Sequence, residues 1–382
     1  MFIRLPLSQR RRRSRGLTLV ELMVGVAIGL IGTVAIFQAV GAWSRHTQTT
    51  TAGSDAQVAG TLALFHIERD IKAAGHGFGM ASLPVMGCPV ISTLVGPPFT
   101  LTPINIQQGA GGAPDTITVL YGNSPFFVGQ GTFTSSTGTT KALTRRTGFH
   151  MGDIAVVAGP GGGPGTAPCE LIEITDDTAV DGLTISHDVG NYVNFYTGNV
   201  AARFNGVAVP PPLAAGTIYS LGPQPTLAVW TITTTGPNNV RVLSRTERFA
   251  ATPAIPVAEG VINVKAEYGV DLNNDGQIAN AEWQTVAPAD FRTVLAIRVA
   301  VLVRSRQYER NPDSSSTVVA PVTTVNPTYF GYTGAKAFLM TNADGSPDSG
   351  PADTTPNNWR NYRYRVYERV IPIRNVIWGT YG

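Results

Sequence analysis

The feature that most constrains the fold is an apolar run near the N-terminus that holds a single ionisable side chain. Between Leu17 and Trp43 the only such residue is Glu21, and residues 22–40 are almost wholly apolar. A helix of about 20 apolar residues, at about 1.5 Å per residue, spans the hydrocarbon core of a bilayer, which is about 30 Å thick. The sequence therefore predicts a transmembrane helix over residues 17–43.

A basic segment precedes this run. Residues 1–16 contain six arginines and no acidic residue, whereas the rest of the chain holds the other 22 of the 28 basic residues and all 25 acidic ones. Basic residues beside a transmembrane helix stay on the cytoplasmic side, so we expect everything after Trp43 outside the cytoplasm. The body of the protein is slightly acidic, which argues against a role in binding nucleic acid.

The N-terminal segment differs from a secretory signal peptide. A signal peptide has a shorter apolar core, and a cleavage site of small residues follows that core. Here the candidate cleavage site, Gly16, lies before the apolar run. Cleavage there would leave the membrane helix on the mature protein.

The segment RGLTLVELMVGVAIGLI, residues 15–31, resembles the leader and first helix of type IV pilins and the related pseudopilins. In that family a prepilin peptidase cuts after the glycine that Gly16 matches, and it methylates the new N-terminus, here Leu17. Glu21 matches the glutamate that the family keeps at the fifth mature position. Phenylalanine is the usual first residue, so Leu17 departs from the pattern, and we expect slower N-methylation with cleavage retained.

Glu21 needs a partner, because a carboxylate buried in hydrocarbon costs about 3 kcal/mol on insertion scales. A free amine at Leu17 is largely cationic at neutral pH and is the partner that we expect, from the same chain or from a neighbouring subunit. The alternative is an interfacial glutamate that reaches the lipid headgroups. Gly25 and Gly29 form a GxxxG pair, which allows helices to approach closely in a membrane.

Residues 44–79 are expected to form a linker and then an amphipathic helix. The run SRHTQTTTAGSD is poor in helix formers and predicts a bend. Ser54 and Gln57 have the spacing of a capping box, so we expect a second helix to begin there and to pack on a sheet. Gly75 and Gly77 are expected to end it. The segment IERDIKAAGHGFG resembles the end of the long N-terminal helix in PilW-like minor pilins and GspJ-like pseudopilins.

The stretch 80–253 shows short β-like runs between loops rich in glycine, proline and threonine, and it resembles no family that we can name. Its glycine-rich segment, residues 159–165, lacks the Lys-Ser/Thr of a phosphate-binding loop and is expected to be a surface loop. Several aromatic residues could line a binding site or pack in the core: Phe126, Phe127, Tyr192, Phe195 and Tyr196.

Cys88 and Cys169 are the only cysteines. Outside the inner membrane the compartment is oxidising, so we expect a disulfide between them, and two unpaired thiols are the alternative. The bond would close a loop of about 80 residues, which is worth about 4 kcal/mol in the chain-entropy model. No histidine or further cysteine lies at ligand spacing from them, so a metal-binding role for these two cysteines is not expected.

The run DLNNDGQIANAE, residues 271–282, matches the EF-hand calcium-loop pattern D-x-[DN]-x-[DN]-G-x5-E at every defined position. The preceding residues 261–270 alternate with the period of a strand, so we expect one calcium loop between β elements and no sensor-type helix pair. The alternative is an Asx-rich turn without an ion. The expected ligands are the side chains of Asp271, Asn273, Asp275 and Glu282 and the backbone carbonyl of Gln277.

Similar loops follow a YGV-type strand in PilW-like minor pilins, and residues 291–309 and 362–375 resemble later strands of that family. The expected fold is α+β, with a long, interrupted N-terminal helix whose outer half packs on an antiparallel sheet. Strands that begin near residues 261, 291 and 362 should belong to this sheet. The expected order is a leader (1–16), a transmembrane helix (17–43), a linker and helix (44–79) and a β-rich extracytoplasmic domain (80–382).

The resemblance implies a minor pilin that helps to initiate, prime or cap type IV pilus assembly, with prepilin peptidase and other minor and major pilins as partners. Such a protein crosses the inner membrane once, with its N-terminus cytoplasmic and its domain facing the periplasm, and reaches the pilus or cell surface after assembly. The alternatives are a pseudopilin of a type II secretion system and a calcium-dependent tip adhesin. No GxSxG or HExxH signature is present, so an enzyme is not expected.

Overall fold

The computed structural model describes residues 16, 18–81, 85–91, 99–126, 129–145, 148–160, 169–178, 182–206, 213–235, 240–306, 308, 323–331, 335–351, 353 and 357–381. Most of the predicted leader and the first mature residue, Leu17, lie outside the described residues. The chain divides into a first unit, Met1–Ala52, and a second unit, Gly53–Gly382.

One helix, α1 (Leu19–Ala73), runs through residues of both units. The prediction of a bend after Ser44 and of a new helix beginning at Ser54 is wrong, because the helix is continuous there. The hydroxyl of Thr47 donates to the carbonyl of Trp43 one turn earlier, so a threonine in this stretch satisfies its polar group inside the helix. The helix ends where Gly75 and Gly77 adopt left-handed backbone, as predicted.

In the first unit, the segment Leu19–Gly41 is apolar and solvent-exposed. It spans 23 residues with a mean hydropathy of 2.3, which is long and apolar enough to cross a membrane, and none of it is buried within the chain. Thr18 caps the helix by accepting the N–H of Glu21 at 3.2 Å. Glu21 thus lies in the first turn, where the helix dipole favours a negative charge.

The second unit contains three large sheets, and the α+β prediction is confirmed. A four-stranded antiparallel sheet has the order β17-β16-β18-β21, and it contains all three of the strands expected near residues 261, 291 and 362. Its strands are β16 (Val261–Val270), β17 (Trp283–Gln284), β18 (Val294–Arg304) and β21 (Tyr364–Pro372). The short helix α2 (Arg374–Tyr381) follows β21.

The second sheet has five antiparallel strands in the order β15-β14-β13-β4-β3. These are β3 (Ile104–Gln107), β4 (Thr116–Tyr121), β13 (Thr226–Thr235), β14 (Val240–Glu247) and β15 (Ile255–Glu259). Both of the first two sheets contribute buried residues to one hydrophobic core together with the C-terminal half of α1.

The third sheet has eight strands in the order β2-β1-β8-β7-β12-β5-β6-β9, of which only β1 and β8 are paired in parallel. Its strands are β1 (Pro89–Ile91), β2 (Phe99–Thr100), β5 (Gln130–Ser136), β6 (Thr140–Leu143), β7 (Ile154–Ala158), β8 (Cys169–Glu173), β9 (Thr184–Ser186) and β12 (Gly216–Gly222). The described residues of the unit also form two hairpins: β10 (Asn191–Asn194) with β11 (Gly198–Ala201), and β19 (Thr328–Tyr329) with β20 (Lys336–Ala337).

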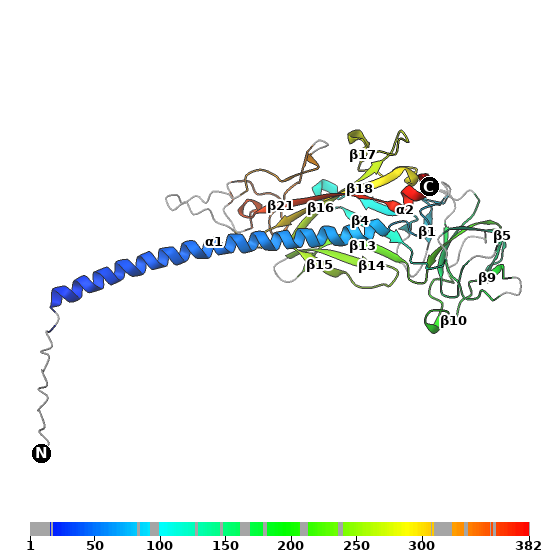
Figure 1. Ribbon diagram of the computed structural model, residues 1–382, viewed down its shortest axis with the longest axis horizontal. Coiled ribbons are helices and arrows are strands. Elements are labelled where there is room, and N and C mark those ends of the chain that lie inside the picture. Colours follow the sequence, from blue (N-terminus) through cyan, green and yellow to red (C-terminus); the bar gives the residue numbers. More distant parts are fainter. Residues whose placement is uncertain are drawn as a thin grey trace, which may run out of the picture. The chain divides into compact units, whose positions relative to one another are not determined.

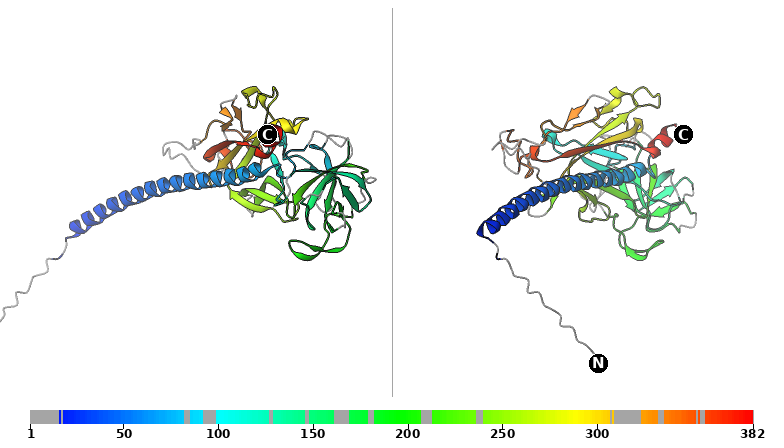
Figure 2. Two further views of the ribbon diagram at one scale, coloured as in Figure 1. Left: turned by 45° about the vertical axis from the view of Figure 1, so that its right-hand side comes forward. Right: turned by 60° about the vertical axis from the view of Figure 1, so that its left-hand side comes forward.

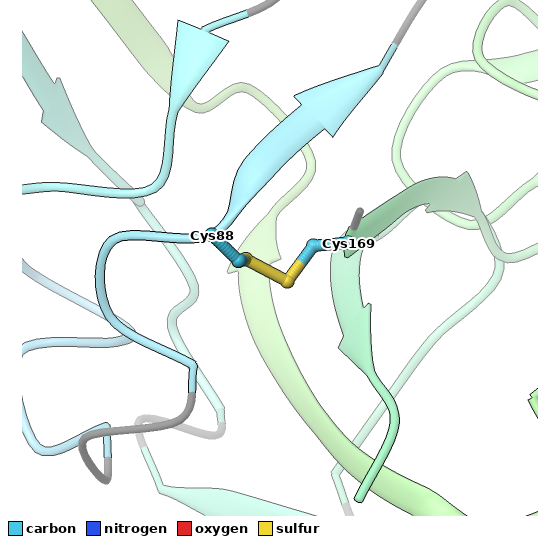
Figure 3. Close-up of a disulfide and its surroundings, with 2 residues drawn as sticks. All are labelled: Cys88 and Cys169. Carbon is cyan, nitrogen blue, oxygen red and sulfur yellow. A yellow bond between two sulfur atoms is a disulfide. The ribbon is translucent and has the colours of Figure 1, made fainter. Parts of the chain in front are cut away.

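The disulfide joins Cys88, directly before β1, to Cys169 at the start of β8 (Figure 3). The two Cα atoms are 5.9 Å apart and the residues are separated by 81 positions in the sequence. Because β1 and β8 form the parallel pair of the sheet, the bond lies where the chain returns after a long connection. Closing a loop of this length stabilises the folded state by about 4 kcal/mol in the chain-entropy model.

The buried carboxylate of Asp70 anchors the C-terminal part of α1 to the five-stranded sheet. Its oxygens accept hydrogen bonds from the Tyr121 hydroxyl (3.1 Å), the Trp230 indole N–H (3.2 Å) and the Arg245 Nε–H (2.8 Å). These partners lie on β4, β13 and β14, and Asp70 itself is completely buried. A buried charge is stable only when it is paired and hydrogen-bonded, so one side chain secures the helix to three strands.

The same part of α1 contacts the four-stranded sheet (Figures 1 and 2). Glu68 forms an ion pair with Arg369 of β21, and the Asn375 amide donates to the carbonyls of Ala73 and Ala74 at the helix end. A Cβ at Gly60 would overlap the Tyr367 ring, so glycine permits the close approach of helix and strand. The outer half of α1 thus packs on two sheets, where the sequence predicted one.

We expect Asp70→Ala to destabilise the protein by about 3 kcal/mol, because it leaves the Arg245 guanidinium and the Trp230 N–H without their buried partner. The measurement is urea unfolding of the full chain in detergent. Asp55→Ala is the matched control, since it removes an exposed carboxylate from the same helix and should change stability by less than about 0.5 kcal/mol. Equal effects of the two substitutions would contradict the anchoring role.

Candidate functional site

The predicted calcium loop lies between two strands of the four-stranded sheet. β16 ends at Val270, the loop covers residues 271–282, and β17 begins at Trp283. The last three loop residues form a 3-10 helix, η2 (Asn280–Glu282). The loop is therefore flanked by β elements, as the strand period of residues 261–270 predicted.

The first predicted ligand organises the turn. Asp271 is fully buried, and its two oxygens accept the N–H groups of Asp275 (3.1 Å) and Gly276 (2.8 Å). Asn274 and Gly276 both take left-handed backbone, with φ of 57° and 75°. Glycine adopts this conformation without strain, and asparagine is one of the few other residues that tolerate it.

The last predicted ligand closes the loop. Glu282 is buried, and its carboxylate accepts the N–H of Leu272 at 3.1 Å and that of Ala279 at 2.7 Å. Because Leu272 directly follows Asp271, these hydrogen bonds bring the two ends of the motif together. The first and last ligands of the pattern are thus neighbours in space as well as partners in the motif.

The two expected ligands in the middle of the loop, Asn273 and Asp275, are exposed and hydrogen-bonded to each other. The Asn273 amide donates to Asp275 at 3.0 Å, and Asp275 accepts the N–H of Gln277 at 2.8 Å. Within the described part of the chain, no three Asp, Glu, His or Cys side chains are grouped closely enough to hold a metal. A cation would therefore have to draw these oxygens, and the Gln277 carbonyl, toward the buried carboxylates.

The donor set nevertheless fits a hard cation. All of the expected ligands are oxygens, which calcium prefers, and they come from a loop that already turns around the Asp271 carboxylate. Glu282 is a buried carboxylate whose two oxygens accept backbone N–H groups. A bound cation would supply countercharge to these buried acids.

A second polar cluster lies in the eight-stranded sheet and was missed by the sequence analysis. The buried Lys141 ammonium donates to Ser136 Oγ (2.9 Å) and His187 Nε2 (3.1 Å), and it pairs with Glu170 (3.3 Å). A serine beside a lysine can form a nucleophile–base pair. Here, however, the three ammonium donors face three acceptors, so the arrangement is that of a satisfied structural cluster.

The aromatic residues of the unassigned region divide into two groups. The hydroxyls of Tyr192 and Tyr196 donate to the buried carboxylates of Glu173 and Asp153, and they attach the β10–β11 hairpin to the sheet. Burial is the main cause that raises the pKa of both tyrosines well above its usual value. Phe126 and Phe195 are exposed and contact the His150 ring, whereas Phe127 lies outside the described residues.

Two family models match the chain. One, described as the prokaryotic N-terminal methylation motif, matches residues 11–37, which contain Gly16, Leu17 and Glu21. The other, described as type IV pilus-assembly protein W, matches residues 229–375, from β13 to the start of α2. These two matches support a PilW-like type IV pilin. Comparison with curated proteins and with solved structures gave no match.

The PilW match covers the four-stranded sheet, the 271–282 loop and the β13–β14–β15 part of the five-stranded sheet. It begins at residue 229, so the last part of the stretch that the sequence left unassigned belongs to the PilW-like region. All eight strands of the third sheet and the disulfide lie outside the match. The eight-stranded sheet thus belongs to the part of the chain that no family model matches.

The pH dependence of stability should show a contribution from His187. Burial, with the charge of Lys141, lowers the pKa of His187 to about 4, whereas the unfolded chain takes up this proton near pH 6.5. Above pH 6.5 the group is neutral in both states and does not reduce the free energy of unfolding. As the pH falls toward 4 the unfolded state gains the proton first, so the free energy of unfolding falls by about 3 kcal/mol, at about 1.4 kcal/mol per pKa unit. The charge of Asp188 raises the pKa of His187 and moderates the effect, while Glu170 pairs with Lys141.

The test compares the free energy of unfolding of the wild type and of His187→Gln between pH 4 and pH 7. Glutamine keeps an acceptor for Lys141 and removes the titration, so the wild type should lose more stability than the variant as the pH falls. Parallel curves for the two proteins would contradict the assignment.

Proposed function

We propose that this PilW-like pilin is a minor subunit that helps to initiate, prime or cap a type IV pilus. The observation that carries the proposal is the pairing of a fully exposed 23-residue apolar segment with a second unit built from three sheets. An exposed apolar surface of this length needs a bilayer or other apolar helices around it. A unit of this size is hard to repeat at every position of a thin filament, which favours a rare position.

Processing and location follow from the N-terminal motif. We propose that prepilin peptidase cleaves after Gly16 and methylates Leu17, and that the helix then holds the subunit in the inner membrane with the second unit on the periplasmic side. Glu21, in the first turn of α1, would pair with an N-terminal amine when the helix enters the filament core. As a pilin, the protein would act as a structural subunit and not as an enzyme.

We also propose that the 271–282 loop binds one calcium ion. Asp271, Asn273, Asp275 and Glu282 would contribute side-chain oxygens, and Gln277 its carbonyl. Asp271 already accepts two N–H groups of the turn, and Glu282 holds the end of the loop to Leu272 at its start, so that the ion would add countercharge to a preformed turn. The role of the ion would be to stabilise the junction between β16 and β17.

Two alternative functions remain: a subunit of a secretion system and an adhesin. A pseudopilin of a type II secretion system would use the same N-terminal chemistry, but the match to a pilus-assembly family favours the pilus. A calcium-dependent tip adhesin is the second alternative. Its binding surface would be sought in the eight-stranded sheet, which lies outside that match.

Deletion of the gene should abolish or sharply reduce surface pili and leave exoprotein secretion intact, and the wild-type gene should restore the pili. Normal pili with a secretion defect would assign the protein to the secretion machine.

In the same strain, Glu21→Ala should be cleaved normally but fail to enter filaments, because its helix lacks the buried countercharge. Asp55→Ala, on the exposed part of α1, is the control that should restore pili; incorporation of Glu21→Ala at the wild-type level would refute the role of the carboxylate.

Calcium should raise the melting temperature of the wild-type protein, and the double variant Asp271→Ala/Glu282→Ala should lose this response. For a dissociation constant of roughly 0.1–1 mM, about 5 mM calcium stabilises the folded state by about 1–2 kcal/mol. Asp344→Ala, in another exposed loop, is the control that should keep the response. An unchanged melting temperature of the wild type at millimolar calcium would show that the loop is a turn without an ion.

A further inference from the structure

We propose that Arg298 is a positioning residue for the calcium loop and that it couples calcium binding to the docking of residues 323–331 and 335–340. This inference rests on the proposed calcium site. The coupling would run from Glu282 through Trp283 to the Arg298 side chain, and from there to the β19–β20 hairpin. Each of these contacts is formed by described residues.

The first link in the coupling is the peptide bond between Glu282 and Trp283. Trp283 directly follows Glu282, and it pairs with Gly269 in the β16–β17 ladder. A Cβ at Gly269 would lie 2.9 Å from the Trp283 ring, so the absence of a side chain there lets the indole lie close against β16. A shift of the Glu282 backbone toward an ion would therefore move or fix the Trp283 ring.

The second step is a stack of two rings on one guanidinium. Arg298 Cζ lies 4.8 Å from the centre of the Trp283 ring and 4.1 Å from that of Phe330. The side chain is buried, and its Nε donates at 2.9 Å to Glu267, which lies opposite it in the β16–β18 register. A desolvated guanidinium between aromatic faces is held strongly in one orientation.

The third step leads to the hairpin. Phe330 lies between β19 and β20 and packs in a separate hydrophobic cluster with Phe338, Met340 and Trp359. Its N–H donates at 2.7 Å to Glu368 of β21, and Glu267 also forms an ion pair with Lys336 of β20. The same arginine and its carboxylate partner thus contact both the loop exit and the hairpin.

Phe330 itself indicates that this docking needs support. Its φ is 56°, a left-handed value that a bulky residue rarely adopts. Such a conformation persists only where surrounding contacts hold it, and these include Arg298, Glu368 and the hydrophobic cluster. Removing the Trp283–Arg298 support should therefore release the hairpin.

The coupling must act in both directions. If calcium favours the seated position of Trp283, then an intact Arg298 stack must favour calcium binding by the same factor. Calcium should therefore strengthen the protection of residues 323–331 and 335–340, and loss of the arginine should weaken calcium binding. Neither effect is expected if the stack only fills space in the core.

The experiment uses the full chain in detergent, with calcium affinity measured by calorimetry and backbone protection by hydrogen exchange. In the wild type, calcium should slow exchange in 323–331 and 335–340. Arg298→Leu should bind calcium about tenfold more weakly and lose that response. Arg304→Leu is the matched control, because Arg304 lies on the same strand, 4.7 Å from the Tyr362 ring, and should leave both readouts unchanged.

A second variant guards against misfolding of Arg298→Leu. Phe330→Leu keeps an apolar side chain and removes only the ring on the hairpin side, so it should bind calcium more weakly and lose the calcium-dependent protection. If it keeps the wild-type affinity and response, the inference is overturned. If the wild type binds calcium without any change in exchange at 323–331 and 335–340, the calcium site stands and the coupling does not. If calorimetry detects no binding to the wild type, both proposals fail.

Discussion

The structure of the second unit depends on the buried carboxylate of Asp70. A charge in this position would cost several kcal/mol if it were left alone, and it is tolerated because Tyr121, Trp230 and Arg245 all donate to it. These partners come from three strands of one sheet, so the helix has one position in which every group is satisfied. Contacts with β21 and α2 then hold the four-stranded sheet against the same part of the helix.

The same helix carries a second carboxylate with the opposite arrangement. Asp70 finds its partners inside the folded chain, whereas Glu21 lies in an exposed apolar segment, where a bilayer or a filament core would surround it. The C-terminal part of α1 is thus buried and paired within the folded chain, whereas its N-terminal part is suited to burial by a bilayer or by neighbouring subunits. This division of one helix between folding and assembly is the physical basis of the proposed pilin function.

The region that matches the PilW family shares the main hydrophobic core with α1 and the eight-stranded sheet, and it contains the loop that we propose to bind calcium. That loop is connected through Trp283 to the Arg298 stack, and the stack also supports the β19–β20 hairpin. The eight-stranded sheet outside the match has its own buried cluster around Lys141 and its own disulfide. The disulfide and the Lys141 cluster thus lie in the eight-stranded sheet and the Arg298 stack in the matched region, while the main hydrophobic core is common to both.

Local patterns in the sequence determined the apolar segment, the Gly16–Glu21 spacing, the 271–282 loop and the strands near 261, 291 and 362. Each of these depends on spacing between residues close in the chain, such as the strand period or the ligand positions of one loop. The sequence did not predict that the helix continues through residues 44–55, where hydrogen bonds within the helix outweigh the weak helix preference of threonine and glycine. Tertiary structure alone decided the partners of Asp70, which lie 51 to 175 residues away, and the contact of Arg298 with Phe330. No spacing rule connects residues so far apart, since only the folded sheets bring them together.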